Sequence, residues 1–139
     1  MSKRIDLVRR AYETAAEAGY LETDWGWFFD QIATDDCELL VSRTYPDAKD
    51  IYAGRDGWIE FWTAFAEVWQ TWTMEADRIY EPRERMVMAL MCVLAKGHES
   101  GVSIDRREAH VWIFRGDRVR RIEAWPDRDE AYRELGLSM

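Results

Sequence analysis

Apolar residues recur at helical spacing in the first third of the chain. Over residues 4–18 they lie three or four positions apart, at Ile5, Val8, Tyr12 and Ala15. This spacing predicts a first helix that ends near Gly19. Thr23 or Asp24 can cap a second helix. The apolar face of that second helix would carry Trp25, Phe28, Phe29 and Ile32.

The clearest helical pattern in the chain covers residues 54–72. Aromatic residues there have the spacing of one continuous helical face, at Trp58, Trp62, Phe65, Trp69 and Trp72. We therefore expect one long amphipathic helix over this range. Between the second and third helices, residues 37–41 predict a short strand. Residues 43–53 predict a loop, because they contain Pro, Asp and Lys.

The second half of the chain has the pattern of strands. Residues 74–81 alternate weakly, and residues 86–95 are almost wholly apolar, as in a strand that is buried on both faces. Gly116 and Asp117 predict a two-residue hairpin turn between strands at 108–115 and 118–125. Asp127 and Glu130 predict the start of a short last helix that ends at Gly136. This order indicates an α+β fold, and 139 residues favour a single domain over residues 1–139.

The two-residue turn fixes a register for this hairpin in which Arg115 pairs with Arg118. On that register one face carries large rings and titratable groups, with His110 opposite Glu123, Trp112 opposite Arg121, and Trp125 beyond them. The other face is aliphatic and carries Val111, Ile113, Ile122 and Ala124. Directly opposed residues have Cβ atoms roughly 4.5–5.5 Å apart. His110 and Glu123 would then be close enough to move a proton, although an ordinary cross-strand pair explains the same pattern.

The composition is unusually rich in aromatic residues, with 8 Trp, 6 Tyr and 5 Phe. Each buried indole N–H needs an acceptor, so a core filled with tryptophan alone is difficult to build. A cavity relieves that problem, because a ligand or water can supply the acceptor. The aromatic stripe fits either an ordinary core or such a cavity. The residues that would bind a ligand are Trp25, Phe29, Trp58, Trp62, Trp69, Trp112, Arg121 and Trp125.

The net charge of −8 argues against polyanionic partners. Basic residues are interleaved with acidic ones, so we expect binding neither to nucleic acid nor to membranes. Cys37 and Cys92 have no paired spacing, which predicts reduced thiols and a cytoplasmic location. His98 and His110 lack the spacing of metal ligands, and we expect neither a metal nor a cofactor. We expect no signal peptide and no membrane span.

The chain resembles the NTF2-like superfamily, and within it the SnoaL-like polyketide cyclase group, from about residue 5 to residue 137. The segments that carry the resemblance are YAGRDGWIEFW at 52–62, SGV at 100–102 and AHVWIFRGDRVRRIEAWPDRDEAYRELGL at 109–137. The resemblance implies a cone, in which a curved mixed sheet wraps round three helices and encloses a pocket. It also implies a homodimer formed through the outer face of the sheet, a role that would suit Val111, Ile113 and Ile122.

The resemblance also bears on the candidate catalytic residues. Tyr12 matches in position the first-helix tyrosine that donates to the oxyanion in ketosteroid isomerase, and His110 falls where that enzyme keeps a protonated aspartate. The catalytic base of the isomerase would fall near Val41 or Ser42, neither of which can serve. The Asp-Arg-Asp set of limonene epoxide hydrolases is not matched either. We therefore expect neither of these two reactions.

Three functions remain open on the sequence. The first is binding of a small, largely apolar molecule, aromatic or polyketide-like, without turnover. The second is an enzyme of the cyclase, isomerase or dehydratase type, in which His110 is the general acid/base, Glu123 orients it and Tyr12 donates to an oxyanion. The third is a structural or regulatory dimer whose pocket is closed by its own side chains.

Overall fold

One mixed sheet organises the computed structural model, which describes residues 2–99 and 101–137. Residue 100, the first of the SGV segment, lies outside the described residues. The elements in chain order are α1 (Lys3–Ala18), α2 (Gly26–Gln31), β1 (Ala33–Leu40), β2 (Tyr52–Ala53), α3 (Gly54–Val68), β3 (Trp69–Arg83), β4 (Met86–Gly97), β5 (Ser103–Arg115), β6 (Arg118–Trp125) and α4 (Arg128–Leu135). Over the described residues the strand order is β2-β1-β6-β5-β4-β3. β1 and β6 are parallel, and the other neighbouring strands are antiparallel.

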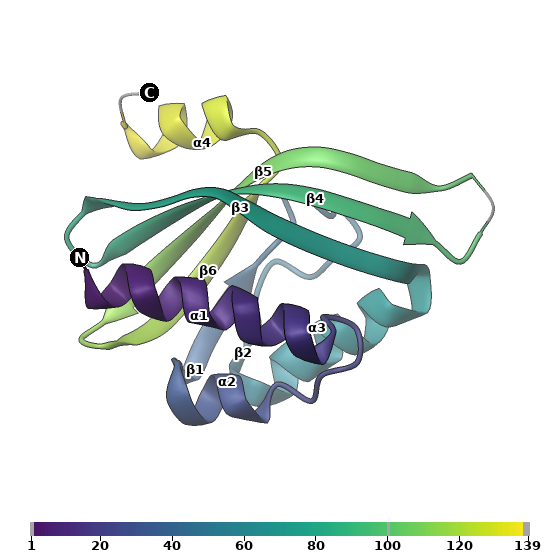
Figure 1. Cartoon of the computed structure of the whole chain (residues 1–139), viewed down its shortest axis with the longest axis horizontal. Coiled ribbons are helices and arrows are strands. Elements are labelled where there is room, and N and C mark those ends of the chain that lie inside the picture. Colours follow the sequence, from purple (N-terminus) through teal and green to yellow (C-terminus); the bar gives the residue numbers. More distant parts are fainter. Residues whose placement is uncertain (1, 100, 138–139) are drawn as a thin grey trace.

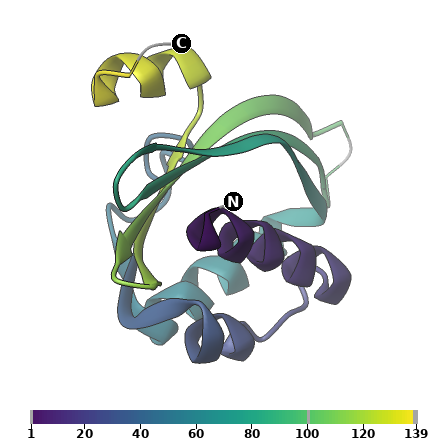
Figure 2. The same cartoon turned by 60° about the vertical axis from the view of Figure 1, so that its left-hand side comes forward.

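The sheet curves round the first three helices. Figure 1 shows α1 lying under the arch of β3, β4 and β5, with α2 and α3 on the other side of α1. In the turned view of Figure 2, α1 is enclosed between the sheet and the α2–α3 pair, and α4 lies outside the sheet. This is the α+β cone that the sequence predicts. Among the described helices, none has the length and hydropathy needed to cross a membrane.

The first helix follows its predicted pattern closely. Ser2 caps the start of α1, and its hydroxyl accepts hydrogen bonds from the backbone amides of Arg4 and Ile5. It is followed by Gly19 at φ +87°, a backbone conformation that favours glycine. The buried face of α1 carries Val8, Ala11 and Ala15. This face packs against the concave side of the sheet and brings α1 within reach of the strands.

The third helix is shorter than the predicted range of 54–72. α3 ends at Val68, and the chain continues directly into β3 at Trp69. Trp69 and Trp72 therefore belong to a strand, in which Trp72 pairs with Ala95 of β4. Aromatic and β-branched residues are favoured in strands, and pairing with the long apolar strand β4 prevails over the helical spacing. The predicted aromatic stripe is thus divided between a helix and a strand.

Apolar side chains pack against both faces of the sheet. The larger cluster fills the space between the concave face and α1, α2 and α3, and includes Val8, Phe28, Ile32, Trp58, Val93 and Phe114. The smaller cluster lies on the convex face and joins Met88, Ala109, Val111 and Trp125 to Ala131 of α4. Val111, which was predicted to serve a dimer interface, is therefore buried within its own chain. The homodimer itself stays a prediction.

Candidate functional site

A β-bulge in the last hairpin decides which side chains face the interior of the cone. Arg115 pairs with Arg118 as predicted, but Ile113 pairs with Arg121, so Arg120 is an extra residue in β6. One extra residue exchanges the two faces of a strand beyond that point. The sequence does carry a sign of this bulge, because Val119 and Ile122 are three positions apart with Arg120 and Arg121 between them, which breaks the two-residue alternation of a strand.

The predicted pair of His110 with Glu123 is wrong for this reason. His110 pairs with Ala124 and lies on the concave face, whereas Glu123 pairs with Val111. Glu123 lies on the convex face, where Trp125 Nε1–H donates to its Oε1 at 3.3 Å. Trp125 accordingly belongs to the convex cluster and not to a pocket.

The other β6 residues are exchanged between the faces in the same way. Arg121 pairs with Glu38 of β1, with 2.9 Å between Nη2 and Oε1, and does not reach the interior. Ile122 and Ala124, which were predicted on the outer aliphatic face, line the interior instead.

A chain of hydrogen-bonded side chains links β5 to α1. His110 Nε2 lies 3.0 Å from Glu108 Oε1, and His110 Nδ1 lies 2.8 Å from the hydroxyl oxygen of Tyr12. Trp112 Nε1–H donates to the same hydroxyl at 2.9 Å. Arg106 holds the second oxygen of Glu108 through Nε at 2.7 Å and Nη2 at 2.5 Å. We refer to Arg106, Glu108, His110 and Tyr12 as the polar chain.

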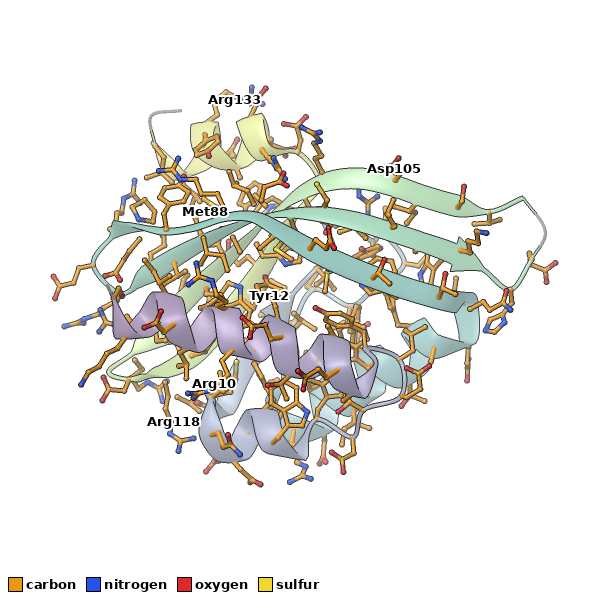
Figure 3. The ribbon with its side chains drawn as sticks, viewed as in Figure 1. Arg10, Tyr12, Met88, Asp105, Arg118 and Arg133 are labelled. Carbon is orange, nitrogen blue, oxygen red and sulfur yellow. The ribbon has the colours of Figure 1, made fainter. Side chains whose placement is uncertain are left out.

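Strand alternation places the β5 members of the polar chain on one face. Residues 106, 108, 110 and 112 alternate with residues such as Asp105, which points away from the helices in Figure 3. Tyr12 comes from α1 and lies between that helix and the sheet (Figure 3), within hydrogen-bond distance of His110. Glu108 was not predicted as a site residue. Its position two residues before His110 on a predicted strand was the signal that could have found it.

The polar chain has a definite direction of donation. An indole N–H only donates and an ionised carboxylate only accepts, so Trp112 donates to Tyr12 and His110 donates from Nε2–H to Glu108. When His110 is neutral, its Nδ1 carries no hydrogen and accepts from the Tyr12 hydroxyl. The network therefore assigns the Nε2–H tautomer to His110.

Glu108 remains ionised although its side chain is almost completely buried. Burial alone raises the pKa of Glu108, but the hydrogen bonds and charges of His110 and Arg106 outweigh it and hold the pKa below its usual value. Burial raises the pKa of Tyr12 well above its ordinary value. Tyr12 therefore stays a neutral phenol that can donate a hydrogen bond.

The polar chain borders a cavity of about 80 Å³. One water molecule needs roughly 10–15 Å³ on the same measure, so the space is several times larger than a water site. Most of its lining is aromatic, including Tyr20, Trp25, Phe28, Trp58, Phe65 and Trp72. The polar side chains in the lining include Tyr12, Tyr45, Glu108 and His110. Tyr45 comes from the segment predicted as a loop, and its hydroxyl donates to Glu108 Oε2 at 3.3 Å.

The predicted ligand-binding residues divide into two groups. Trp25, Trp58, Trp62 and Trp112 line the cavity, as does Tyr12 of the candidate catalytic set. Over the part of the chain that the structure describes, the lining does not include Phe29, Trp69, Arg121 and Trp125. Phe29 packs against the ring of Trp58 at 5.9 Å, and Trp69 packs against that of Trp72 at 5.6 Å. These two rings support the cavity wall from behind.

Four tryptophans of the lining have buried indole N–H groups. Within residues 2–99 and 101–137, the indole nitrogens of Trp25, Trp58, Trp62 and Trp72 have no hydrogen-bond partner. Trp27 also lines the cavity, but its N–H donates to Thr23 Oγ1 at 3.0 Å. These four indoles therefore contribute to the cavity wall mainly through their apolar rings.

The remaining reactive groups offer no further centre. Among the described residues, no cluster of three or more His, Cys, Asp or Glu side chains could hold a metal ion. Burial, with smaller contributions from Asp36 and Glu38, raises the pKa of Cys37 to about 12. A thiol with such a pKa is a poor nucleophile at neutral pH.

Comparisons with known proteins identify the fold. No protein-family model and no curated protein sequence matches the chain. Among solved structures, an NTF2-like protein of unknown function from Burkholderia pseudomallei is 20% identical with a TM-score of 0.75, over 96% of this chain and 97% of that one. TerC, co-crystallised with polyporic acid, is 17% identical with a TM-score of 0.75, over 96% and 98%. A candidate SnoaL-like polyketide cyclase from Jannaschia sp. CCS1 is 12% identical with a TM-score of 0.70, over 99% and 94%.

Proposed function

We propose that this chain, which has the NTF2-like fold, binds a small, largely apolar and planar molecule in the aromatic cavity. The observation that carries the proposal is a cavity lined by rings with one hydrogen-bonded polar chain in its wall. Apolar pockets with a few placed polar groups are typical of small-molecule sites. Two proteins of the same fold support an aromatic or polyketide-like ligand, namely TerC with polyporic acid and the candidate polyketide cyclase.

The wall of the cavity orients such a molecule. Burying an unpaired polar group is costly, so an oxygen of the ligand would lie where a donor is present. Tyr12 is held between Trp112 and His110 and is fixed in position by both. Apolar rings would pack against Phe28 and Trp58, whose ring centres are 4.7 Å apart. Burial of apolar area would provide most of the affinity.

A pair of neighbouring alanines on α1 tests the binding site. Ala15 is 2% exposed and lines the cavity, whereas Ala16 beside it is exposed. We expect Ala15→Leu to weaken calorimetric binding of polyporic acid or indane by about tenfold or more, because the added carbons fill the cavity. Ala16→Leu should leave affinity unchanged. Equal effects of both variants, or no binding of either compound by the wild type, would contradict the proposal.

Because Ala15→Leu can also disturb packing, Ala124→Val provides a second test from the opposite wall. Ala124 is on β6 and lines the cavity beside His110. Circular dichroism would show that each variant is folded. If both variants are folded and both bind the ligand with wild-type affinity, the ligand must bind outside this cavity.

The direction of donation in the polar chain favours a second candidate function, namely proton transfer to the bound molecule. If His110 becomes protonated, it donates from both nitrogens, to Glu108 and to the Tyr12 oxygen. The hydrogen of Tyr12 is then free to move to an oxygen of the ligand, while the His110 Nδ1 proton moves to Tyr12. His110 would be the general acid/base, Glu108 would position it and Tyr12 would stabilise a developing oxyanion.

Enolisation of 1-indanone provides an assay for this second candidate. In deuterium oxide, its C2 protons exchange through an enol that forms when Tyr12 gives a proton to the carbonyl oxygen and solvent water takes the proton from C2, and NMR measures the rate of exchange. We expect the protein to accelerate exchange, and His110→Ala, Tyr12→Phe and Glu108→Gln to lower the rate. Glu123→Gln is the matched control, because Glu123 lies on the other face. An unchanged rate in His110→Ala would leave only the binding function.

A further inference from the structure

One short segment of chain separates the cavity from solvent between α1 and α2. Figure 2 shows it passing along the outside of the molecule from the end of α1 to the start of α2. Tyr20 and Trp25 line the cavity and are 5% and 4% exposed, whereas Glu22 and Asp24 between them are exposed. We call residues 19–25 the α1–α2 segment. Because some of its residues face the cavity and others face solvent, the segment is a wall one chain thick.

The backbone of the α1–α2 segment is bonded locally. The amides of Glu22 and Thr23 both donate to the carbonyl oxygen of Gly19, at 3.2 and 3.0 Å. The carbonyl oxygen of Trp25 accepts from the amide of Phe28 in α2 at 3.1 Å. These bonds join the segment to itself and to α2, so breaking them leaves the pairing of the strands intact. Segments held in this way open at a low cost in free energy.

Both ends of the α1–α2 segment have a left-handed backbone. Gly19 has φ +87° and Trp25 has φ +63°. Glycine adopts such an angle readily, but for a side chain as bulky as tryptophan it is rare and strained. A strained conformation persists only where its surroundings hold it, and such residues are concentrated at ligand clamps and switch regions. The ring of Trp25 is held by stacking on Trp62 at 5.0 Å and by contact with Trp58 at 5.8 Å, so leaving these rings releases the strain.

The side chain of Thr23 holds the α1–α2 segment in place. Its hydroxyl oxygen accepts from the backbone amide of Trp25 at 3.3 Å and from the indole Nε1–H of Trp27 at 3.0 Å. Trp27 lies in the cavity lining, so one oxygen atom connects the strained end of the segment to the wall. Loss of this single acceptor would therefore free two donors together.

A second stretch of irregular chain also lines the cavity, but it is tied to the sheet. Tyr45 lies in the connection between β1 and β2 and is half-buried. The hydroxyl of Thr44 beside it donates to the carbonyl oxygen of Ala124 in β6 at 3.0 Å. Tyr45 itself is bonded to Glu108 and Arg106 of β5. Movement of this connection would disturb contacts with two strands, which favours the α1–α2 segment as the way into the cavity.

We infer that the α1–α2 segment is a gate through which ligands enter and leave the cavity, and that Thr23 is its latch. The inference rests on the proposed binding function and adds the control of access to the same cavity. Gly19 and Trp25 are the hinges, because hinges are a few residues at the ends of elements that absorb changes in backbone angle. Opening moves Tyr20 and Trp25 away from the lining, and closing returns them and excludes water from the bound molecule.

The kinetics of binding test the gate through Thr23→Val, which keeps the shape of the side chain and removes the acceptor. Stopped-flow tryptophan fluorescence with 1-indanone gives the association and dissociation rate constants. If opening limits both, the weaker latch should raise both about fivefold and change the affinity less than about twofold. A rise in the dissociation rate constant alone would overturn the inference, because Thr23 would then only support the wall.

Thr44→Val is the matched control, because it makes the same change in the connection between β1 and β2. It should leave both rate constants close to those of the wild type, since the ligand does not pass this connection. An increase in Thr44→Val as large as that in Thr23→Val, or in Thr44→Val alone, would contradict the assignment of the gate. The entrance would then lie on the side of Tyr45.

Amide hydrogen exchange tests the same opening without a ligand. The amides of Glu22 and Phe28 take part in the local bonds of the segment and should exchange several-fold faster in Thr23→Val. The amide of Tyr45, in the other connection, should be unchanged. Wild-type exchange at Glu22 and Phe28 in this variant would sink the inference even if 1-indanone binds. Failure of both 1-indanone and polyporic acid to bind would contradict the proposed function, and the exchange rates would still decide whether the segment opens.

Discussion

At the scale of single residues, the candidate site depends on which carboxylate meets His110. The hairpin pattern pointed to His110 and the resemblance to ketosteroid isomerase pointed to Tyr12, and the structure places their side chains 2.8 Å apart. The carboxylate was assigned to the wrong residue. Glu108 and Glu123 are both acidic neighbours of His110 on a predicted hairpin, and only the bulge at Arg120 decides between them.

Replacing each of the two glutamates by glutamine tests this assignment through stability. Glu108 is 1% exposed and holds both Arg106 and His110, so Glu108→Gln should lower the free energy of unfolding by about 2–4 kcal/mol. Glu123→Gln keeps an oxygen that can accept from Trp125 and should cost less than about 1 kcal/mol. Urea unfolding measures both values. A larger loss for Glu123→Gln would contradict the register described above.

The pH dependence of stability follows from the same carboxylate. The pKa of folded Glu108 lies below its usual value of 4.5, so its contribution to stability is fully present above pH 4.5. That contribution is lost as the pH falls through the folded pKa. The difference in unfolding free energy between wild type and Glu108→Gln should therefore be constant near neutrality and shrink below pH 4.5. A difference that grows on acidification would contradict the assigned direction of the shift.

At the scale of elements, local sequence patterns predicted the helices and the last hairpin well. They did not predict where a helix passes directly into a strand or where a strand has a bulge. The caps of α1 and α4 were readable from Gly19, Asp127 and Gly136. The transition from α3 to β3 at Val68 was not, because the aromatic spacing continues through it. What ends the helix is pairing of Trp69 and the residues after it with β4, a contact distant in sequence. The bulge at Arg120 was missed because the register set by the two-residue turn was extended through the whole hairpin, past the break in alternation at Arg120 and Arg121.

The turn between β3 and β4 allows a test of backbone conformation. Arg85 has φ +64° and an exposed side chain, so its conformation is one that glycine adopts more easily. Arg85→Gly should raise the free energy of unfolding by about 0.5–1 kcal/mol, since it removes this strain. Glu84→Gly, in the same turn, should lower stability or leave it unchanged. Equal destabilisation by both substitutions in thermal or urea unfolding would contradict the prediction.

At the scale of the whole molecule, the fold was predictable and the function of the cavity was only partly so. The order of helices and strands led to an α+β fold, the resemblance of particular segments implied the NTF2-like cone, and the solved structures confirm that fold. The cavity depends on how α1, α3 and the sheet come together, which periodicity does not describe. Tyr45 shows this plainly, because it joins the site from a segment without regular structure.

A crystal structure of the protein with 1-indanone tests the central claim most directly. The account predicts the compound inside the cavity between α1, α3 and β5. Its carbonyl oxygen should lie about 3 Å from the hydroxyl of Tyr12. Compound bound only on the outer surface would contradict it.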